Sequence, residues 1–246
     1  ALENAKNGID EHFLSARLED DNLLLLEELG NILNIKTPLH IELFDNSHLQ
    51  GSEPIGAMVC FINGVKTPSM YRKYNIKQSS GKDDLKSMYE VIYRRYSRLK
   101  KENQPFPDLI LVDGGFNQLK VAQKALDDLD IKINLAGLEK DDHQHTSTLL
   151  TLEKEYSLSN QSKLFLFLVR MQDEVHRFAI TFHRQKRSKK VISSFFDNIE
   201  GIGEKRKEML NKAYPSLDSL KNASLEELSQ IVPQEVGQRI IDKLNK

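Results

Sequence analysis

Two short apolar segments, far apart in the chain, both end in an aspartate: Ile41–Asp45 and Leu109–Asp113. Apolar runs of this length, followed by turn residues, are typical of buried β-strands. An Asp at the end of such a strand lies where the sheet meets solvent, the usual place for chemistry in α/β folds. If the two strands are neighbours, their carboxylates come close together and require a cation between them. The repeated pattern therefore predicts a metal-dependent hydrolase of phosphodiesters, although either Asp alone could simply cap a loop.

The bulk composition predicts a globular protein with one large domain or two small ones. Of the 246 residues, 39% are hydrophobic and 29% are charged, which is ordinary for folded, water-soluble chains. The longest strongly apolar stretch, Leu164–Val169, is too short to cross a bilayer, so no membrane partner is expected. A single cysteine and the lack of a visible signal peptide predict a cytoplasmic protein without a disulfide framework. The first residues, Ala-Leu-Glu, suggest a fragment of a longer protein.

The order of the expected elements predicts an α/β ribonuclease H-like domain over residues 38–190, after a lead-in helical segment at 1–37. Strands are expected at 40–45, 56–62, 70–76, 108–113 and 131–136, and helices at 83–101, 118–129 and 163–182, with a variable stretch at 140–160. An antiparallel three-strand meander followed by right-handed crossovers is the ribonuclease H-like topology. Its first and fourth strands are adjacent. This is a second line of argument that brings Asp45 and Asp113 together.

Residues 191–246 are predicted to form a separate, all-α tandem helix-hairpin-helix domain that binds DNA. Gly201-Ile202-Gly203 precedes a helix, and its glycines would open backbone amides to an anion at the helix N-terminus. Lys205 and Arg206 follow in the first turn, where cations oppose the helix dipole. We therefore expect them to contact a phosphate backbone. The second hairpin carries the acidic Glu235 and is expected to be structural or a weaker contact.

A run of basic residues precedes this domain and includes Arg184, Lys186 and Arg187. The net charge of −1 for the whole chain does not exclude nucleic acid as a partner, because binding depends on how the charges are distributed over the protein. The run could be a solvated helix face. Its position beside the glycine-rich hairpin favours contacts with DNA phosphates, which supply most non-specific affinity.

His176 lies on the long helix expected at 163–182. A histidine among apolar neighbours is most often half-buried and hydrogen-bonded. In a ribonuclease H-like fold, however, this helix passes the two strand aspartates, so His176 could complete a metal site or transfer a proton. His183, seven residues further on, is the alternative.

Five motifs resemble the C-terminal half of the UvrC family, the excision nuclease subunits of bacterial nucleotide excision repair: Phe44–Gly51, Tyr71–Tyr74, Arg94–Tyr96, Val112–Gly115 and Asp173–Ile180. The resemblance runs from about residue 20 to the end of the chain. It implies a ribonuclease H-like endonuclease domain that makes the 5′ incision beside a lesion in double-stranded DNA. It also implies a repair complex with a UvrB-type helicase subunit, and a 3′ incision made by another domain.

By the same resemblance, Asp45, Asp113 and His176 occupy the positions of the catalytic triad and of the metal ligands, with Mg²⁺ or Mn²⁺ as the metal. The acidic pair Asp83-Asp84 also matches a family feature; Asp84 is the member expected in the active site, and a helix-capping role is the alternative for Asp83.

Lys140 and His145 lie in a matching loop that is expected to face the same cleft. The sequence departs from the family at Phe116-Asn117, where Lys-Gly is usual, and the segment 152–163 is shortened. Two other functions remain open: a catalytically weakened DNA- or protein-binding scaffold, and a structure-specific nuclease that acts without repair partners. The intact acids favour the repair nuclease.

Overall fold

The computed structural model describes residues 20–47, 54–76, 84–140, 147–197 and 199–245. The chain divides into two compact units, 1–180 and 181–246. Within the described residues, no helix is both long and apolar enough to cross a membrane.

The first unit is built on one mixed sheet, in the order β3-β2-β1-β5-β6-β7-β8, with β4 also paired to β2. Strand β1 is antiparallel to β2 and parallel to β5, and β5 is parallel to β6. The strands are β1 (His40–Ser47), β2 (Ile55–Ile62), β3 (Val65–Lys66), β4 (Arg72–Asn75), β5 (Leu109–Asp113), β6 (Asn134–Lys140), β7 (Ser147–Leu150) and β8 (Glu155–Ser157). The predicted adjacency of the first and fourth predicted strands, here β1 and β5, is therefore confirmed.

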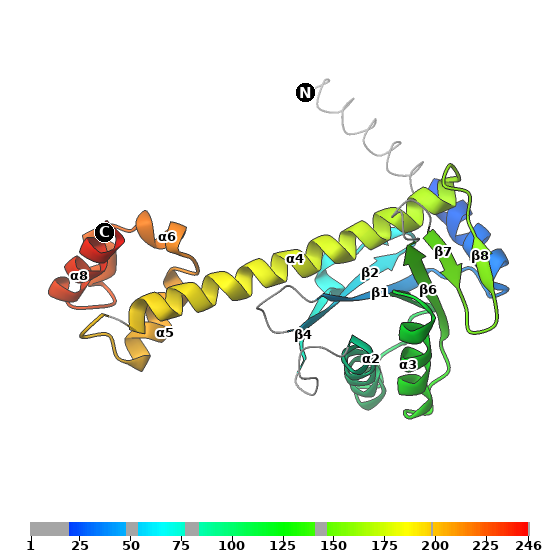
Figure 1. Cartoon of the computed structure of the whole chain (residues 1–246), viewed down its shortest axis with the longest axis horizontal. Coiled ribbons are helices and arrows are strands. Elements are labelled where there is room, and N and C mark those ends of the chain that lie inside the picture. Colours follow the sequence, from blue (N-terminus) through cyan, green and yellow to red (C-terminus); the bar gives the residue numbers. More distant parts are fainter. Residues whose placement is uncertain (1–19, 48–53, 77–83, 141–146, 198, 246) are drawn as a thin grey trace, which may run out of the picture. The chain divides into compact units, whose positions relative to one another are not determined.

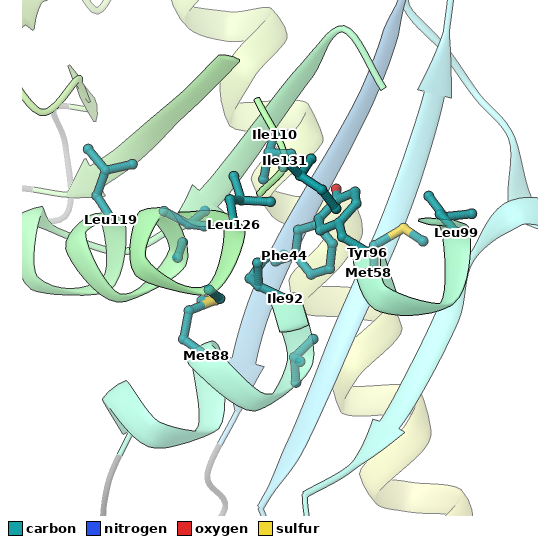
Figure 2. Packing of buried hydrophobic residues seen from close by; sticks show 14 of the residues in the cluster. Phe44, Met58, Met88, Ile92, Tyr96, Leu99, Ile110, Leu119, Leu126 and Ile131 are labelled. Carbon is teal, nitrogen blue, oxygen red and sulfur yellow. The ribbon is translucent and has the colours of Figure 1, made fainter. Parts of the chain in front are cut away.

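Helices cover both faces of this sheet (Figure 1). Helices α2 (Asp84–Lys101) and α3 (Phe116–Asp127) lie on one face, and α4 (Lys163–Asp197) crosses the other. Along β1, alternate side chains point to opposite faces. Phe44 accordingly packs toward α2 and α3, in the core that Figure 2 shows with Met58, Ile92 and Leu126. Asp45, one residue further on, projects to the α4 face.

One ion pair is buried within this core. Glu42 of β1 and Arg95 of α2 are both almost completely buried and form a salt bridge. The Tyr96 hydroxyl donates to Glu42 Oε2 at 2.8 Å, and Arg95 Nε donates to the same oxygen at 3.2 Å. Because a buried carboxylate is costly unless it is paired and hydrogen-bonded, these contacts fix α2 against the strand that carries Asp45.

Several predicted boundaries were wrong. The third predicted strand, 70–76, is observed as the shorter β4, because Met70 ends a 3₁₀ turn (Pro68–Met70); the two-residue β3, which was not predicted, precedes this turn. The strand expected at 131–136 begins at Asn134 instead, because Ile131 packs into the helix-covered core before the strand starts. Part of the variable stretch extends the sheet as β7 and β8, and α4 continues to Asp197. In the lead-in segment the described helix spans 20–33, and residues 1–19 lie outside the described part.

The second unit is all α, as predicted. It contains the C-terminal half of α4 and the helices α5 (Glu204–Ala213), α6 (Leu217–Lys221), α7 (Leu225–Ser229) and α8 (Gln234–Leu244). Capping boxes at Ser216 and Ser224 start the two short helices, each with reciprocal backbone and side-chain bonds. The helices close around a small apolar core that includes Phe196, Leu210 and Ile240.

Candidate active site

Asp45 and Asp113 lie side by side at the carboxyl ends of β1 and β5. The last paired residues of these parallel strands are Phe44 and Val112, and each Asp is the next residue of its strand. Asp45 is buried, whereas Asp113 is half-buried. The sheet therefore assembles the acidic pair that the sequence predicted.

Helix α4 places one polar side chain over each of these acids. Gln172 donates from Nε2 to Asp113 Oδ1 at 2.9 Å and to the Leu138 carbonyl oxygen at 3.3 Å. One turn later, His176 Nδ1 lies 3.7 Å from Asp45 Oδ2, and the imidazole is 57% exposed. His176 thus lies against Asp45 as predicted. The alternative, His183, is fully buried, which leaves His176 as the histidine that solvent and a substrate can reach.

Asp45 Oδ2 is a buried oxygen without a hydrogen-bond partner among the residues that the structure describes. A buried carboxylate oxygen left in this state is costly, and a bound cation removes the cost. Two carboxylates from neighbouring strands are the hard oxygen ligands that Mg²⁺ and Mn²⁺ prefer. The residues therefore fit such an ion. Within the described ranges, no cluster of three or more His, Cys, Asp and Glu side chains has metal-site geometry, so the three-residue ligand set stays a prediction.

The turn after Asp113 is packed tightly onto β6. The Leu138 carbonyl oxygen accepts a bond from Gly114 N at 3.1 Å as well as the one from Gln172. A methyl group on Gly137 would lie 2.9 Å from the Gly114 carbonyl oxygen, so a side chain there would displace this turn. The carboxylate of Glu139 lies directly against the backbone of Gly115.

Sequence reasoning missed Gln172 and Glu139. The signal for Gln172 was its position four residues before His176, since residues with this spacing share a helix face. Glu139 could not be found in this way, because the predicted strand ended at 136, before the residues that face the Asp113 turn.

Asp84 is the first residue of α2, and its backbone oxygen accepts a bond from Asn46 Nδ2 at 3.3 Å. Its exposed position next to the end of β1 agrees with the predicted place near Asp45, and its part in the chemistry stays a prediction. Asp83 and His145 lie outside the described residues. Lys140 is the last residue of β6, and its side chain is also outside the described part.

Phe116, where the family usually has Lys, begins α3 and is exposed. The ammonium of Lys120, one turn later, lies 4.8 Å from the centre of the Phe116 ring. A cation is therefore present one helical turn from the position where the family's lysine is missing.

In the second unit, the glycine-rich hairpin has the backbone that its sequence predicted. Gly201 has φ +97°, which other residues rarely adopt, and a methyl group there would meet Val236 at 2.8 Å. A methyl group on Gly203 would meet nothing within 4 Å, so a phosphate could approach the start of α5 closely. Arg206 Nη1 donates to the Gly201 carbonyl oxygen at 3.0 Å, and this bond supports the hairpin.

The remaining residues predicted to bind DNA also belong to the second unit. Lys205 is exposed in the first turn of α5, and Ile202 is half-buried against the small core. Arg184 and Arg187 are exposed on α4, and the Lys186 ammonium lies 5.8 Å from the centre of the Phe182 ring. DNA contact at each of these residues stays a prediction.

Comparison with solved structures finds proteins of low sequence identity. The chain is 19% identical to a Ciona intestinalis endonuclease V variant in complex with a 23-mer DNA containing an inosine followed by a ribo-adenosine, with a TM-score of 0.33, covering 42% of this chain and 46% of that one. A second complex of this endonuclease gives 16% identity, a TM-score of 0.33 and coverage of 52% and 58%. Clostridium butyricum Argonaute, bound to a guide DNA and a 19-mer target DNA, gives 17% identity, a TM-score of 0.30 and coverage of 53% and 19%. The chain thus spans about half of the endonuclease and a fifth of Argonaute.

The family assignment rests on two matches that together span both units. Residues 30–180 match the UvrC RNase H endonuclease domain, and residues 193–246 match the SAM-like helix-hairpin-helix tandem. The first match includes the strands that carry Asp45 and Asp113 and the part of α4 that carries His176. The chain belongs to the UvrC family, with its ribonuclease H-like endonuclease domain followed by a helix-hairpin-helix tandem.

Proposed function

We propose that this protein is a divalent-metal-dependent DNA endonuclease that makes the 5′ incision beside a lesion in nucleotide excision repair. The observation that carries the proposal is the pair formed by Asp45 and Asp113 at adjacent strand ends. Within the described residues, the buried Asp45 Oδ2 has no hydrogen-bond donor, and His176 Nδ1 lies 3.7 Å from it. Membership of the UvrC family supports damaged double-stranded DNA as substrate, a UvrB-type helicase subunit as partner and the cytoplasm as location.

Asp45 and Asp113 are the residues that would hold Mg²⁺ or Mn²⁺. When bound, such an ion polarises the scissile phosphate and lowers the pKa of an attacking water. Gln172 holds Oδ1 of Asp113 through its amide, which fixes the orientation of that carboxylate in the absence of an ion. Asp45 is kept in place by the pairing of β1 with strands on both sides.

His176 is placed to move a proton at the edge of the site. Its Nδ1 faces the Asp45 carboxylate at 3.7 Å, and its ring is more than half exposed. A protonated imidazole can give a proton to the leaving oxygen, while the neutral form can accept one from water. Asp84, at the exposed start of α2, is proposed to assist at the same edge.

The second unit is proposed to hold the duplex. Backbone amides at the start of α5, together with Lys205 and Arg206, would bind phosphates at the hairpin. The basic residues of α4, Arg184, Lys186 and Arg187, would add further phosphate contacts. We propose that the endonuclease domain spans residues 38–190 and that the helix-hairpin-helix domain spans residues 191–246.

The test is incision of a lesion-bearing duplex in the presence of a UvrB-type subunit, with Mg²⁺, with Mn²⁺ and with EDTA. We expect Asp45→Asn and Asp113→Asn to abolish the 5′ incision, and EDTA to abolish it for the wild type. Asp130→Asn is the matched control, because Asp130 is exposed and has φ 52°, a conformation that Asn adopts readily. Normal incision by either site variant would refute the assignment. If the wild-type protein binds the DNA but does not incise it, the scaffold function would be favoured instead.

A further inference from the structure

Lys73 lies in the same row of the sheet as the two site aspartates. Asp45 pairs with Ala57 of β2, and Ala57 in turn pairs with Lys73 of β4. Directly opposite residues on paired strands project from the same face, so the Lys73 side chain leaves the sheet on the face that α4 covers. Lys73 and Asp45 are two strand spacings apart, about 10 Å.

Aromatic side chains hold the Lys73 ammonium in position. Its Nζ lies 4.9 Å from the centre of the Phe178 ring, and Phe178 follows His176 by two residues on α4. The edge of Tyr71 meets the same ring, with the centroids 5.1 Å apart. Lys73 is nevertheless exposed. A cation over an aromatic face is stabilised there, so the positive charge has a defined place beside the acidic pair and is open to solvent.

Glu174 contacts this cluster through Tyr71. Glu174 accepts a bond from the Tyr71 hydroxyl at 3.0 Å and forms an ion pair with Arg177 at 2.7 Å. Burial acts to raise the pKa of Glu174, but the bonds from Arg177 and Tyr71 hold this pKa below its ordinary value. Glu174 is therefore ionised at neutral pH and is matched by Arg177.

We propose that Lys73, Phe178 and Tyr71 form a subsite for the sugar-phosphate backbone of a DNA strand, next to the proposed incision site. The inference rests on the proposed function, and it gives a role to the Tyr71–Tyr74 motif, which the incision mechanism leaves unused. Lys73 binds a phosphate of the strand whose scissile phosphate lies at Asp45 and Asp113. A duplex strand advances about 3.4 Å per nucleotide along its axis. The spacing of about 10 Å from Asp45 thus places this phosphate within roughly three nucleotides of the cleaved bond.

The first experiment measures binding without cleavage. The full chain is titrated into a fluorescein-labelled DNA duplex in EDTA, at a series of KCl concentrations, and anisotropy gives the affinity. We expect Lys73→Met to make the slope of log K against log salt less steep by about 0.9, the value for one phosphate contact. Lys73→Arg should restore the slope. Lys132→Met is the matched control, because Lys132 is exposed before β6, at the end of the sheet opposite Asp113. The subsite is refuted if Lys73→Met keeps the wild-type slope.

The second experiment separates this proposal from the function on which it rests. In incision assays with Mn²⁺, Lys73→Met should raise KM several-fold while kcat at saturating DNA stays near the wild-type value. If the wild type incises DNA and Lys73→Met has unchanged KM and unchanged salt dependence, the subsite fails and the nuclease function stands. If the wild type does not incise DNA, but Lys73→Met makes the slope of log K against log salt less steep by about 0.9, the nuclease function fails and the subsite stands.

Discussion

Replacing Gln172 by Met tests whether this buried amide positions Asp113. The substitution keeps nearly the same volume but removes the Nε2 donor that Asp113 Oδ1 and the Leu138 carbonyl oxygen share. A hydrogen bond to a charged group contributes about 1.5–3 kcal/mol, and one between neutral groups about 0.5–1.5 kcal/mol. Two features of the structure reduce the loss. Leu138 keeps its bond from Gly114, and Asp113 is half-exposed, so water can replace the lost donor.

We therefore expect Gln172→Met to lower the free energy of unfolding of the metal-free protein by about 1–2 kcal/mol. For a unit of this size that corresponds to a fall in Tm of roughly 2–8 °C. Because the Asp113 carboxylate then lacks the bond from Gln172 that helps to orient it, the affinity for Mn²⁺ should also fall, by about tenfold.

The assays are thermal unfolding in EDTA, followed by circular dichroism, and Mn²⁺ titration by calorimetry. Gln123→Met is the matched control, since Gln123 also donates to an aspartate, Asp127 Oδ1, at 2.8 Å, but on the surface of α3. Loss of such an exposed pair costs only about 0.2–0.5 kcal/mol, and Mn²⁺ binding should not change. Equal Tm shifts and equal Mn²⁺ affinities for the two variants would refute the positioning role.

Three further outcomes follow from the core and from the turn after the site. Arg95→Met leaves Glu42 buried without its cation and should destabilise the protein by about 3–5 kcal/mol, measured by urea unfolding; a loss below 1 kcal/mol would contradict the burial argument. Gly137→Ala should destabilise by about 1–3 kcal/mol, because its methyl group meets a backbone oxygen. Gly115→Ala should cost clearly less in the same assay, since it meets only the movable end of Glu139; equal costs would contradict this contrast. Burial raises the pKa of the Cys60 thiol to about 12. A thiol reagent at pH 8 should therefore modify Cys60 only as fast as the chain unfolds. Rapid labelling of the native protein would show that the thiol is not enclosed.

Much of the architecture could be predicted from local patterns in the sequence. The apolar runs that end in Asp45 and Asp113 specify strands that begin in the core and end at solvent, and the order of strands and helices leaves few topologies. The motif around His176 lies on a helix whose apolar spacing is visible in the sequence. The glycines at 201 and 203 likewise indicated a hairpin, and the φ of +97° observed at Gly201 is one that residues with a side chain rarely adopt.

Other features depend on contacts between distant segments, which no local pattern encodes. The short β3 and the added strands β7 and β8 follow from pairing to edges that exist only in the folded sheet. The bond from Gln172 to Asp113 joins residues 59 positions apart, and Lys73 reaches the row of Asp45 only through Ala57. The sequence by itself therefore determined which side chains carry the chemistry and at which strand ends they lie. The tertiary structure alone decided which neutral and cationic groups surround these side chains. The strand register and the crossing of α4 over the sheet set the distances between them.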